Sequence, residues 1–286
     1  MSTAIGATPP QASQKQESAR AAAEYHLNAG GQRVRTKIAL QAGLAAGLSS
    51  QDAIIIAATV ELLHSASLVH DDIQDHDEMR RGQPAVWCRF GVNTAICTGD
   101  LLLSAAYATL CKFSDSGALA QMIVLMHARV GMAVDGQCDD LKTDNETVVD
   151  SVTAVAQYQQ IAKAKSGALL SLPLELVLIA SGHEEHLTNA GRAAAAFAIG
   201  YQIVDDLQDL SADVGNKSLR STYNIVAVFN ASYSFDESIE KARALALEQI
   251  DLAISLATHL PYNIGERLGD YACQLRHVVD GHNLEA

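Results

Sequence analysis

The sequence predicts an all-α chain, and three observations favour this fold class. Only 5 of the 286 residues are proline, and aromatic residues make up 5% of the chain. Alanine and leucine, which are strong helix formers, are abundant. Alternating β-branched runs bounded by turns, which would indicate strands, are scarce. Because 49% of the residues are hydrophobic, the predicted helices can bury a sizeable core.

Turn-forming residues divide the chain into separate predicted helices. Gly30 and Gly31 end the first helix, and Arg80–Pro84 forms a loop. Ser181-Gly182 interrupts the chain again, and Ser211–Tyr223 is polar and irregular. The predicted helices cover residues 18–29, 33–47, 51–73, 92–113, 117–138, 147–164, 167–182, 187–209, 236–258 and 264–279.

The length and composition also predict the domain organisation. Residues 1–18 are polar and contain Gly and Pro-Pro, so we expect a disordered N-terminal arm. No stretch inside the remaining sequence resembles a linker. We therefore expect residues 19–286 to form a single all-α domain.

Charge and cysteine usage exclude some classes of function. The net charge is −13 without a basic patch, which argues against nucleic acid as a partner. The five cysteines form no CxxC pair and are expected to be reduced and mostly buried, as in a cytoplasmic protein. No secretory leader and no transmembrane segment is expected.

Two acidic clusters of the form DDxxD carry the strongest signal in the chain. The first comprises Asp71, Asp72 and Asp75, and the second comprises Asp205, Asp206 and Asp209. Each follows a long apolar stretch that is predicted to be helical, and helical spacing turns residues i and i+4 to the same side. Mg²⁺ binds carboxylates together with substrate phosphate oxygens. Although a single DDxxD is usually a solvated helix end, the paired clusters predict a magnesium-dependent enzyme.

Several cationic residues could bind an anionic substrate together with these metal ions. Arg80 and Arg81 follow the first cluster on a loop with a glycine, and arginine forks suit diphosphate oxygens. The alternative is that these arginines neutralise nearby acids. Lys165 lies at a predicted helix break and Lys217 follows the second cluster, where ordinary surface lysines are equally common. His64 is seven residues before Asp71 and therefore lies on the same helix face, although it could instead be a core histidine.

Gly30 and Gly31 precede a predicted helix that carries Arg35. Glycines at a helix N-terminus allow backbone N–H groups to approach an anion. The alternative interpretation is an ordinary turn between two helices.

Taken together, these motifs resemble the trans-isoprenyl diphosphate synthases of the polyprenyl synthetase family, and in particular geranylgeranyl diphosphate synthases. They recur in the family's order over most of the chain. The matching stretches are Gly30–Arg35, Leu63–His70 with the first cluster, Arg80–Gly82, Gly99–Leu102, Gly136-Gln137 with Asp140, Lys165–Gly167, and Tyr201-Gln202 with the second cluster.

The resemblance implies an isoprenoid synthase-type helical bundle around a central cavity, usually as a homodimer. It implies Mg²⁺-dependent head-to-tail condensation of isopentenyl diphosphate with an allylic prenyl diphosphate. The carboxylates implied to hold three Mg²⁺ ions are Asp71, Asp72, Asp75 and Asp205, with Asp206 and Asp209 as further ligands.

Substrate contacts are implied by the same resemblance. Arg80 and Lys165 would bind the allylic diphosphate, with Lys217 near it. Arg35, Arg81 and His64 would bind isopentenyl diphosphate. Ser166 and Gln202 would line the reacting carbons, so that the implied catalytic residues are Asp71, Asp72, Asp75, Lys165, Ser166, Gln202 and Asp205.

The size of the product can be argued from steric grounds. The tail is expected to grow away from the first cluster, and an aromatic side chain at Ala66 or Ser67 would block growth beyond C15. Alanine leaves room, so we expect a C20 or longer all-trans product. Tyr107 is expected to form a deeper floor.

Departures from the family pattern leave a second hypothesis about the function open. Gln32 stands where the family has lysine, and Thr36 stands where it has proline. Losing a cation for isopentenyl diphosphate while keeping both clusters also fits a terpene cyclase or another prenyltransferase that does not use isopentenyl diphosphate. A regulatory subunit is a third reading, but both intact clusters argue against it.

Overall fold

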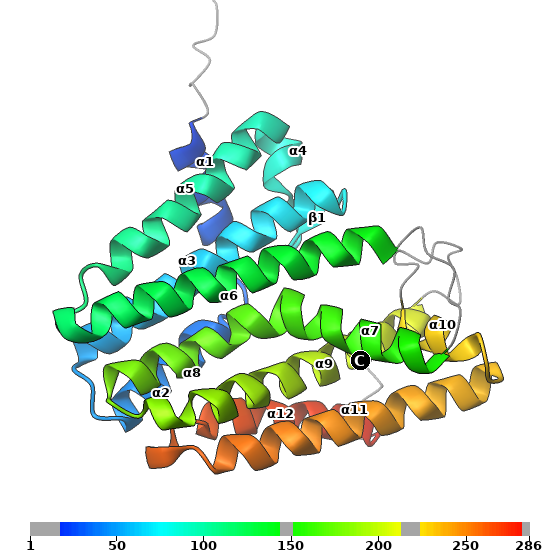
Figure 1. Cartoon of the computed structure of the whole chain (residues 1–286). Helices are drawn as coiled ribbons and strands as arrows, with labels where there is room; N and C mark the ends of the chain where they lie inside the picture. Colours follow the sequence, from blue (N-terminus) through cyan, green and yellow to red (C-terminus); the bar gives the residue numbers. More distant parts are fainter. Residues whose placement is uncertain (1–17, 144–150, 213–223, 282–286) are drawn as a thin grey trace, which may run out of the picture. The chain divides into compact units, whose positions relative to one another are not determined.

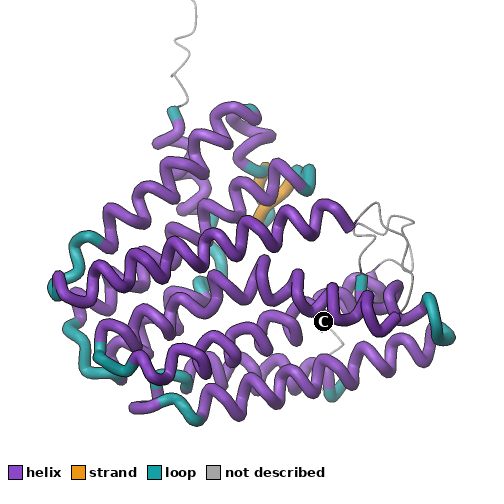
Figure 2. Tube along the Cα trace, in the orientation of Figure 1, coloured by secondary structure: helices purple, strands orange, loops and turns teal. Residues whose placement is uncertain are grey.

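Helices make up almost all of the computed structural model, which describes residues 18–143, 151–212 and 224–281 (Figures 1 and 2). The prediction of an all-α fold is confirmed. Within the described residues the strands are β1 (Met79–Arg80) and β2 (Gln83–Pro84), which pair antiparallel with Arg80 opposite Gln83. The predicted N-terminal arm lies outside the described residues apart from Ser18.

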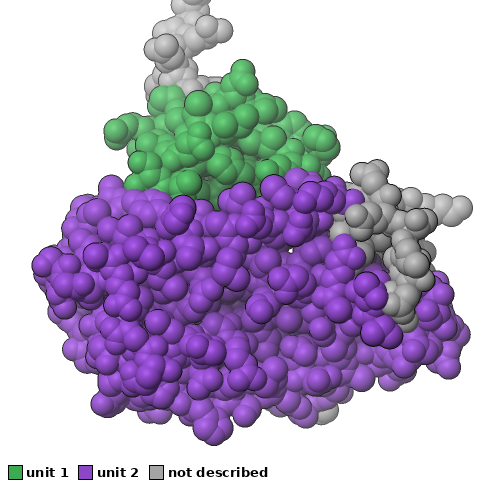
Figure 3. Space-filling model, viewed as in Figure 1, with its two compact units in different colours: residues 1–32, 62–105 green, residues 33–61, 106–286 purple. Residues whose placement is uncertain are grey.

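The chain divides into two compact units, coloured separately in Figure 3. Unit 1 comprises Met1–Gln32 and Leu62–Ala105, and unit 2 comprises Arg33–Glu61 and Ala106–Ala286. The first acidic cluster belongs to unit 1 and the second to unit 2. The expectation of a single domain over residues 19–286 stays a prediction.

The helices begin and end close to the predicted positions. Those with residues in unit 1 are α1 (Ala19–Asn28), the second half of α3 (Ser50–Gln74), α4 (Val86–Phe90) and most of α5 (Val92–Leu110). Unit 2 contains the rest of α3 and α5, with α2 (Val34–Ala45), α6 (Ser116–Thr143), α7 (Ser151–Ala162), α8 (Ala168–Ala180), α9 (Leu187–Ala212), α10 (Ile225–Asn230), α11 (Phe235–Thr258) and α12 (Glu266–Val279). It also has short 3₁₀ turns at Glu184–His186 and Pro261–Asn263.

The structure differs from the predicted elements in three places. Lys163–Gly167 is a π-helical segment that joins α7 directly to α8, where a break between helices was predicted. The hairpin and α4 lie where only a loop was expected, and α10 was not predicted. These elements are too short to give a periodic hydrophobic signal.

The core of unit 2 is built around α8. Every residue from Ala168 to Ile179 is buried, so this helix is apolar all round, as expected of a central helix. Its one charged residue, Glu175, accepts hydrogen bonds from Arg129 Nε at 2.8 Å and from Ser171 Oγ at 2.7 Å. These partners matter because a buried charge is stable only when it is paired and hydrogen-bonded.

Helices α9 and α11 pack side by side in the same unit (Figure 1). The capping box of Ser234 and Glu237 starts α11, and its buried side recurs at helical spacing through Ala242, Ala246 and Ile250. A Cβ at Gly200 of α9 would lie 2.8 Å from Ile250 Cγ1. The small residues therefore let the helix that carries the second acidic cluster pack closely against α11.

Unit 1 has a smaller core that holds the C-terminal half of α3. Ala66 and Val69 are buried there together with residues of α1, α4 and α5, namely Ala22, Ala23, Val86, Ala95 and Leu102. The first acidic cluster lies at the end of α3. This packing therefore fixes the position of the cluster within unit 1.

We expect His26 to make the stability of the fold depend on pH. Its side chain on α1 is 3% exposed, and burial, with Arg81 and Arg80 nearby, lowers its pKa from 6.5 to about 4. The unfolded chain therefore binds more protons below pH 6.5, so stability falls as the pH falls from that value toward 4. We expect about 2 kcal/mol of stability to be lost through His26 between pH 7 and pH 5.

Urea denaturation of the wild type and of His26→Leu at pH 7 and at pH 5 measures the stability that is lost through His26. The variant should lose less stability than the wild type when the pH is lowered. His127→Leu is the matched control, because His127 is exposed on α6. An equal pH dependence in wild type and His26→Leu would show that His26 does not contribute.

Two described helices are long and apolar enough to cross a membrane by length and composition. They are Ser50–Gln74, whose most apolar window is 61% buried inside the protein, and Ser116–Lys142, whose window is 11% buried. Core helices of soluble proteins also pass this test when they are buried. The expectation that no transmembrane segment exists is therefore not confirmed.

The prediction for the cysteines is confirmed in one respect and wrong in another. All five are free thiols in the structure, but all five are exposed and not buried: Cys88, Cys97, Cys111, Cys138 and Cys273. Most lie on helix positions that face outward, a detail that sequence spacing alone did not reveal.

Candidate active site

The first acidic cluster lies at the C-terminal end of α3. The helix stops at Gln74, and His76 takes a left-handed conformation with φ 56° just beyond it. The backbone N–H of Asp75 still bonds to the carbonyl of Asp71 at 2.8 Å. The two residues therefore remain one helical turn apart, as predicted from their spacing.

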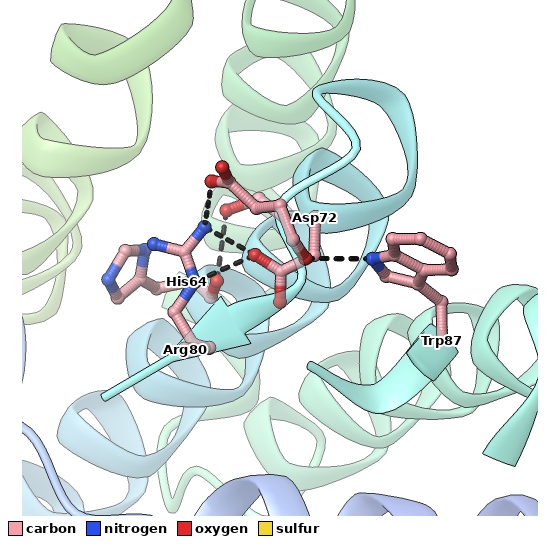
Figure 4. A network of polar contacts seen from close by, with 6 residues as sticks. His64, Asp72, Arg80 and Trp87 are labelled. Carbon is pink, nitrogen blue, oxygen red and sulfur yellow. Dashed lines mark hydrogen bonds and ion pairs between the residues drawn. The ribbon is translucent and has the colours of Figure 1, made fainter. Parts of the chain in front are cut away.

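Asp72 is the buried member of this cluster, with no exposed surface. Its Oδ1 accepts a hydrogen bond from Arg80 Nε at 2.7 Å and a second from Nη2 of the same guanidinium (Figure 4). Arg80 Nη2 also donates to Asp77 Oδ2 at 3.1 Å, while Trp87 Nε1 donates to the Asp77 carbonyl at 2.8 Å. Burial raises the pKa of Asp72 despite this pairing. Arg80 thus pairs with the carboxylates of Asp72 and Asp77 in this structure, and its contact with a diphosphate stays a prediction.

The hairpin between β1 and β2 presents both arginines. Its two turn residues, Arg81 and Gly82, have φ of 54° and 74°, the left-handed pair typical of a tight two-residue hairpin turn. Arg81 Nη1 donates to the carbonyl of Gly30, and a Cβ at Gly31 would lie 2.5 Å from Arg81 Cζ. In this structure Gly31 therefore provides space for the Arg81 guanidinium.

Other residues of unit 1 support the same helix end. His64 is half-buried on α3, and its carbonyl accepts a hydrogen bond from Ser67 Oγ at 2.9 Å. His70, directly before the cluster, lies 3.7 Å from the Asp100 carboxylate, over Gly99. A side chain at Gly99 would overlap the His70 ring. Gly99 and Asp100 are recognisable from the sequence only as motif residues, and the supporting contacts of Asp77, His70 and Trp87 were not predicted from it.

The second acidic cluster lies near the C-terminal end of α9 in unit 2. Asp205 and Asp209 are exposed, whereas Asp206 is buried. Desolvation and the Asp209 carboxylate raise the pKa of Asp205. The two exposed carboxylates lie one helical turn apart, and their role as metal ligands stays a prediction.

Asp206 is already surrounded by hydrogen-bond donors. Its carboxylate accepts from Tyr158 Oη at 2.9 Å, from the Ile225 N–H at 2.9 Å and from Gln202 Nε2 at 3.2 Å. Burial raises its pKa to about 6, although these hydrogen bonds oppose the rise. Tyr158 and Ile225 were not recognised from the sequence, because they lie on α7 and α10, far from Asp206 along the chain.

The π-helical segment places Lys165 and Ser166 between α7 and α8. Lys165 Nζ lies 2.5 Å from Asp140 Oδ2 of α6. A Cβ at Gly136 of α6 would overlap the backbone nitrogen of Lys165 and lie 2.7 Å from the carbonyl carbon of Ala164. π-Helical turns are frequent at functional sites. Here the turn lies close to α6 because Gly136 has no side chain at the point of contact.

We expect Gly136→Ala to lower turnover at least tenfold, since the new methyl group pushes the segment with Lys165 away from α6. Overpacking of this kind costs about 1–3 kcal/mol. Steady-state kinetics and thermal unfolding measure both effects. Gly131→Ala is the matched control on α6, because no atom lies within 4 Å of the position that its methyl group would take. Full activity of Gly136→Ala would contradict the role of this contact.

The remaining predicted residues are placed as follows. Arg35 is half-buried in the first turn of α2, and Thr36 Oγ1 donates to Glu61 Oε2 at 2.6 Å. Lys217 lies outside the described residues.

The donor set fits a hard divalent cation such as Mg²⁺. Within the described part of the chain, no three His, Cys, Asp or Glu side chains form a preformed metal centre. Mg²⁺ does not require one, because it usually takes one or two carboxylates and completes its shell with phosphate and water oxygens. Asp72 Oδ2 is buried and has no hydrogen-bond partner among the described residues. A buried acceptor of this kind is costly unless a cation or donor approaches it.

Comparison with known proteins agrees with this picture. The family model for polyprenyl synthetase matches residues 16–221. A geranylgeranyl pyrophosphate synthase from Geoglobus acetivorans is 32% identical over 79% of this chain and 71% of its own length. A farnesyl diphosphate synthase from Bacillus subtilis is 30% identical over 77% of this chain and 79% of its own.

A solved structure of the Geoglobus acetivorans synthetase has a TM-score of 0.79 at 26% identity, covering 92% of this chain and 93% of that one. The fold and the relatives define an enzyme of the prenyltransferase class. The chain belongs to the polyprenyl synthetase family, and the resemblance to trans-isoprenyl diphosphate synthases is confirmed.

Proposed function

We propose that this enzyme condenses isopentenyl diphosphate head-to-tail with an allylic prenyl diphosphate. The observation that carries the proposal is the presence of two complete carboxylate clusters, each at the end of a long helix, in a chain of this family. Relatives named as geranylgeranyl and farnesyl diphosphate synthases support chain elongation as the reaction.

The cofactor in this proposal is Mg²⁺, held by Asp71, Asp72 and Asp75 of the first cluster and by Asp205 and Asp209 of the second. When bound, the metal neutralises the charge of the leaving diphosphate. Arg80 supplies positive charge beside the first cluster, since its guanidinium already lies against Asp72 and Asp77. Lys165 supplies an ammonium group for the allylic diphosphate.

Binding of isopentenyl diphosphate is assigned to Arg35, Arg81 and His64. Arg81 is already oriented by its hydrogen bond to the Gly30 carbonyl. Gln32, which replaces the family's lysine, is exposed and contributes no charge. This substitution supports the second candidate function, a cyclase or other prenyltransferase that does not use isopentenyl diphosphate.

The proposed product is a C20 or longer all-trans prenyl diphosphate. Small residues at Ala66 and Ser67 support it, as do the relatives named as geranylgeranyl synthases. The reaction leaves an allylic cation that water would destroy, so apolar helix faces must surround the tail.

The proposed assembly is a homodimer. Helix α6 exposes large apolar side chains, including Val124 at 68% and Val134 at 56% exposure. These exposed apolar side chains on one long helix support a contact with another chain, and a second copy of this chain is the partner proposed here. The molar mass in solution, measured by light scattering, distinguishes a dimer from a monomer.

Diphosphate release with and without isopentenyl diphosphate tests the proposed reaction. An elongase releases diphosphate from the allylic substrate in proportion to the isopentenyl diphosphate consumed, and EDTA stops both. Diphosphate release that is unchanged when isopentenyl diphosphate is omitted would favour the cyclase reading.

A further inference from the structure

The surroundings of Asp206 differ from those of its neighbours in the second cluster. Its carboxylate accepts hydrogen bonds from three elements of unit 2: Tyr158 on α7, Gln202 on α9 and the N–H of Ile225 at the start of α10. Asp205 and Asp209 are exposed instead. Three donors occupy most of the lone-pair positions of one carboxylate. Asp206 is therefore built into the protein and not directed at solvent.

Tyr158 is suited to a fixed structural contact. It is 4% exposed, and a buried hydroxyl must find a partner. Its Oη lies 2.9 Å from Asp206 Oδ2, and because a carboxylate can only accept, the hydroxyl is the donor in this contact.

The same contact fixes the orientation of the Gln202 amide. Gln202 lies one helical turn before Asp206, and a carboxylate can only accept hydrogen bonds. The nitrogen of the amide must therefore face Asp206, at the observed 3.2 Å. Because the amide is planar, its oxygen is turned away from Asp206.

We propose that Asp206 is a positioning residue and not a metal ligand: together with Tyr158 it holds Gln202 so that the amide oxygen faces the reacting allylic carbons. The inference rests on the proposed function. In that reaction the allylic C–O bond breaks, the electron pair leaves on the diphosphate oxygen, and positive charge remains on the allylic carbons. An amide oxygen stabilises this charge, whereas an amide NH₂ group would oppose it.

The sharpest variant is Asp206→Asn. The new side chain can turn its oxygen to Tyr158 and the Ile225 N–H, which leaves its NH₂ facing Gln202. Gln202 must then accept with its oxygen and turn its own NH₂ toward the substrate. We expect kcat to fall roughly 100-fold, as for other lost electrostatic contacts to a transition state. KM for both substrates should stay within threefold.

Two further measurements separate positioning from metal binding. The first is the Kd for Mn²⁺, which electron paramagnetic resonance measures without any substrate turnover. The Kd of Asp206→Asn should lie within twofold of the wild-type value, whereas Asp205→Asn should bind Mn²⁺ more weakly. In a Gln202→Ala background, Asp206→Asn should lower kcat no further, because its effect acts through that residue.

The proposal would be overturned if Asp206→Asn weakened Mn²⁺ binding as much as Asp205→Asn does. It would also be overturned if the losses of kcat from Gln202→Ala and Asp206→Asn multiplied in the double variant. If circular dichroism shows that Asp206→Asn does not fold, Tyr158→Phe carries the kinetic part of the test, because it loosens Asp206 but keeps its carboxylate. It should lower kcat in the wild-type background and not in the Gln202→Ala background, and equal losses in both would overturn the proposal. Failure of the proposed function is seen separately, as absence of isopentenyl incorporation by wild type, and the Mn²⁺ titration still decides whether Asp206 is a ligand.

Discussion

Replacing Asp205 with alanine is expected to lower turnover by about a thousandfold while the fold is retained. Asp205 is an exposed carboxylate on α9 that faces the same side as Asp209. Removing a ligand that helps to neutralise a leaving diphosphate costs about 4 kcal/mol of transition-state stabilisation, which corresponds to this factor. Because the side chain is exposed, its loss should not disturb the core.

Steady-state kinetics over a range of Mg²⁺ concentrations measures the effect, and circular dichroism checks the fold. Glu248→Ala on α11 is the matched control, since it also removes an exposed carboxylate from a helix of unit 2. The control should keep wild-type turnover. Unchanged turnover in Asp205→Ala would refute the account in which both clusters hold metal.

Replacing Ser67 with phenylalanine is expected to shorten the main product from C20 or longer to C15. Ser67 lies one helical turn before Asp71 on α3, so an aromatic ring there projects beside the growing tail. The side chain is half-buried, and the hydrogen bond that it loses runs to the His64 carbonyl of its own helix. Chromatography of the dephosphorylated products measures the chain length.

Ala66 is a less suitable position for this test, although the sequence pointed to both residues. Ala66 is 4% exposed and packs in the core of unit 1 against Ala22 and Leu102, among others. Phenylalanine there would overpack the core at a cost of about 1–3 kcal/mol. Ser67→Ala is the control for Ser67→Phe and should leave the product length unchanged. An unchanged product in Ser67→Phe would contradict the steric argument.

The helices could be predicted because their determinants are local. Apolar periodicity over ten or more residues, together with breakers such as Gly30 and Gly182, fixed the bounds of α3, α9 and α11 to within a few residues. Motif spacing likewise located both acidic clusters. These signals need no knowledge of what packs against the helix.

The contacts that set the chemistry of individual side chains could not be predicted in the same way. Asp206 looked like its neighbours in the sequence, yet its partners Tyr158 and Ile225 are 48 and 19 residues away. The role of Gly31 beside Arg81 depends on a close approach between residues far apart in the chain. Such pairings arise from tertiary packing, which overrides what local patterns can show.

The most direct test of the account is product analysis with purified protein, Mg²⁺, labelled isopentenyl diphosphate and C5, C10 or C15 allylic primers in turn. We expect labelled chains of C20 or longer. Labelled products that stop at C15 would contradict the proposed chain length. Metal-dependent diphosphate release without any incorporated label would contradict elongation itself and would make Gln32 the first residue to replace with lysine.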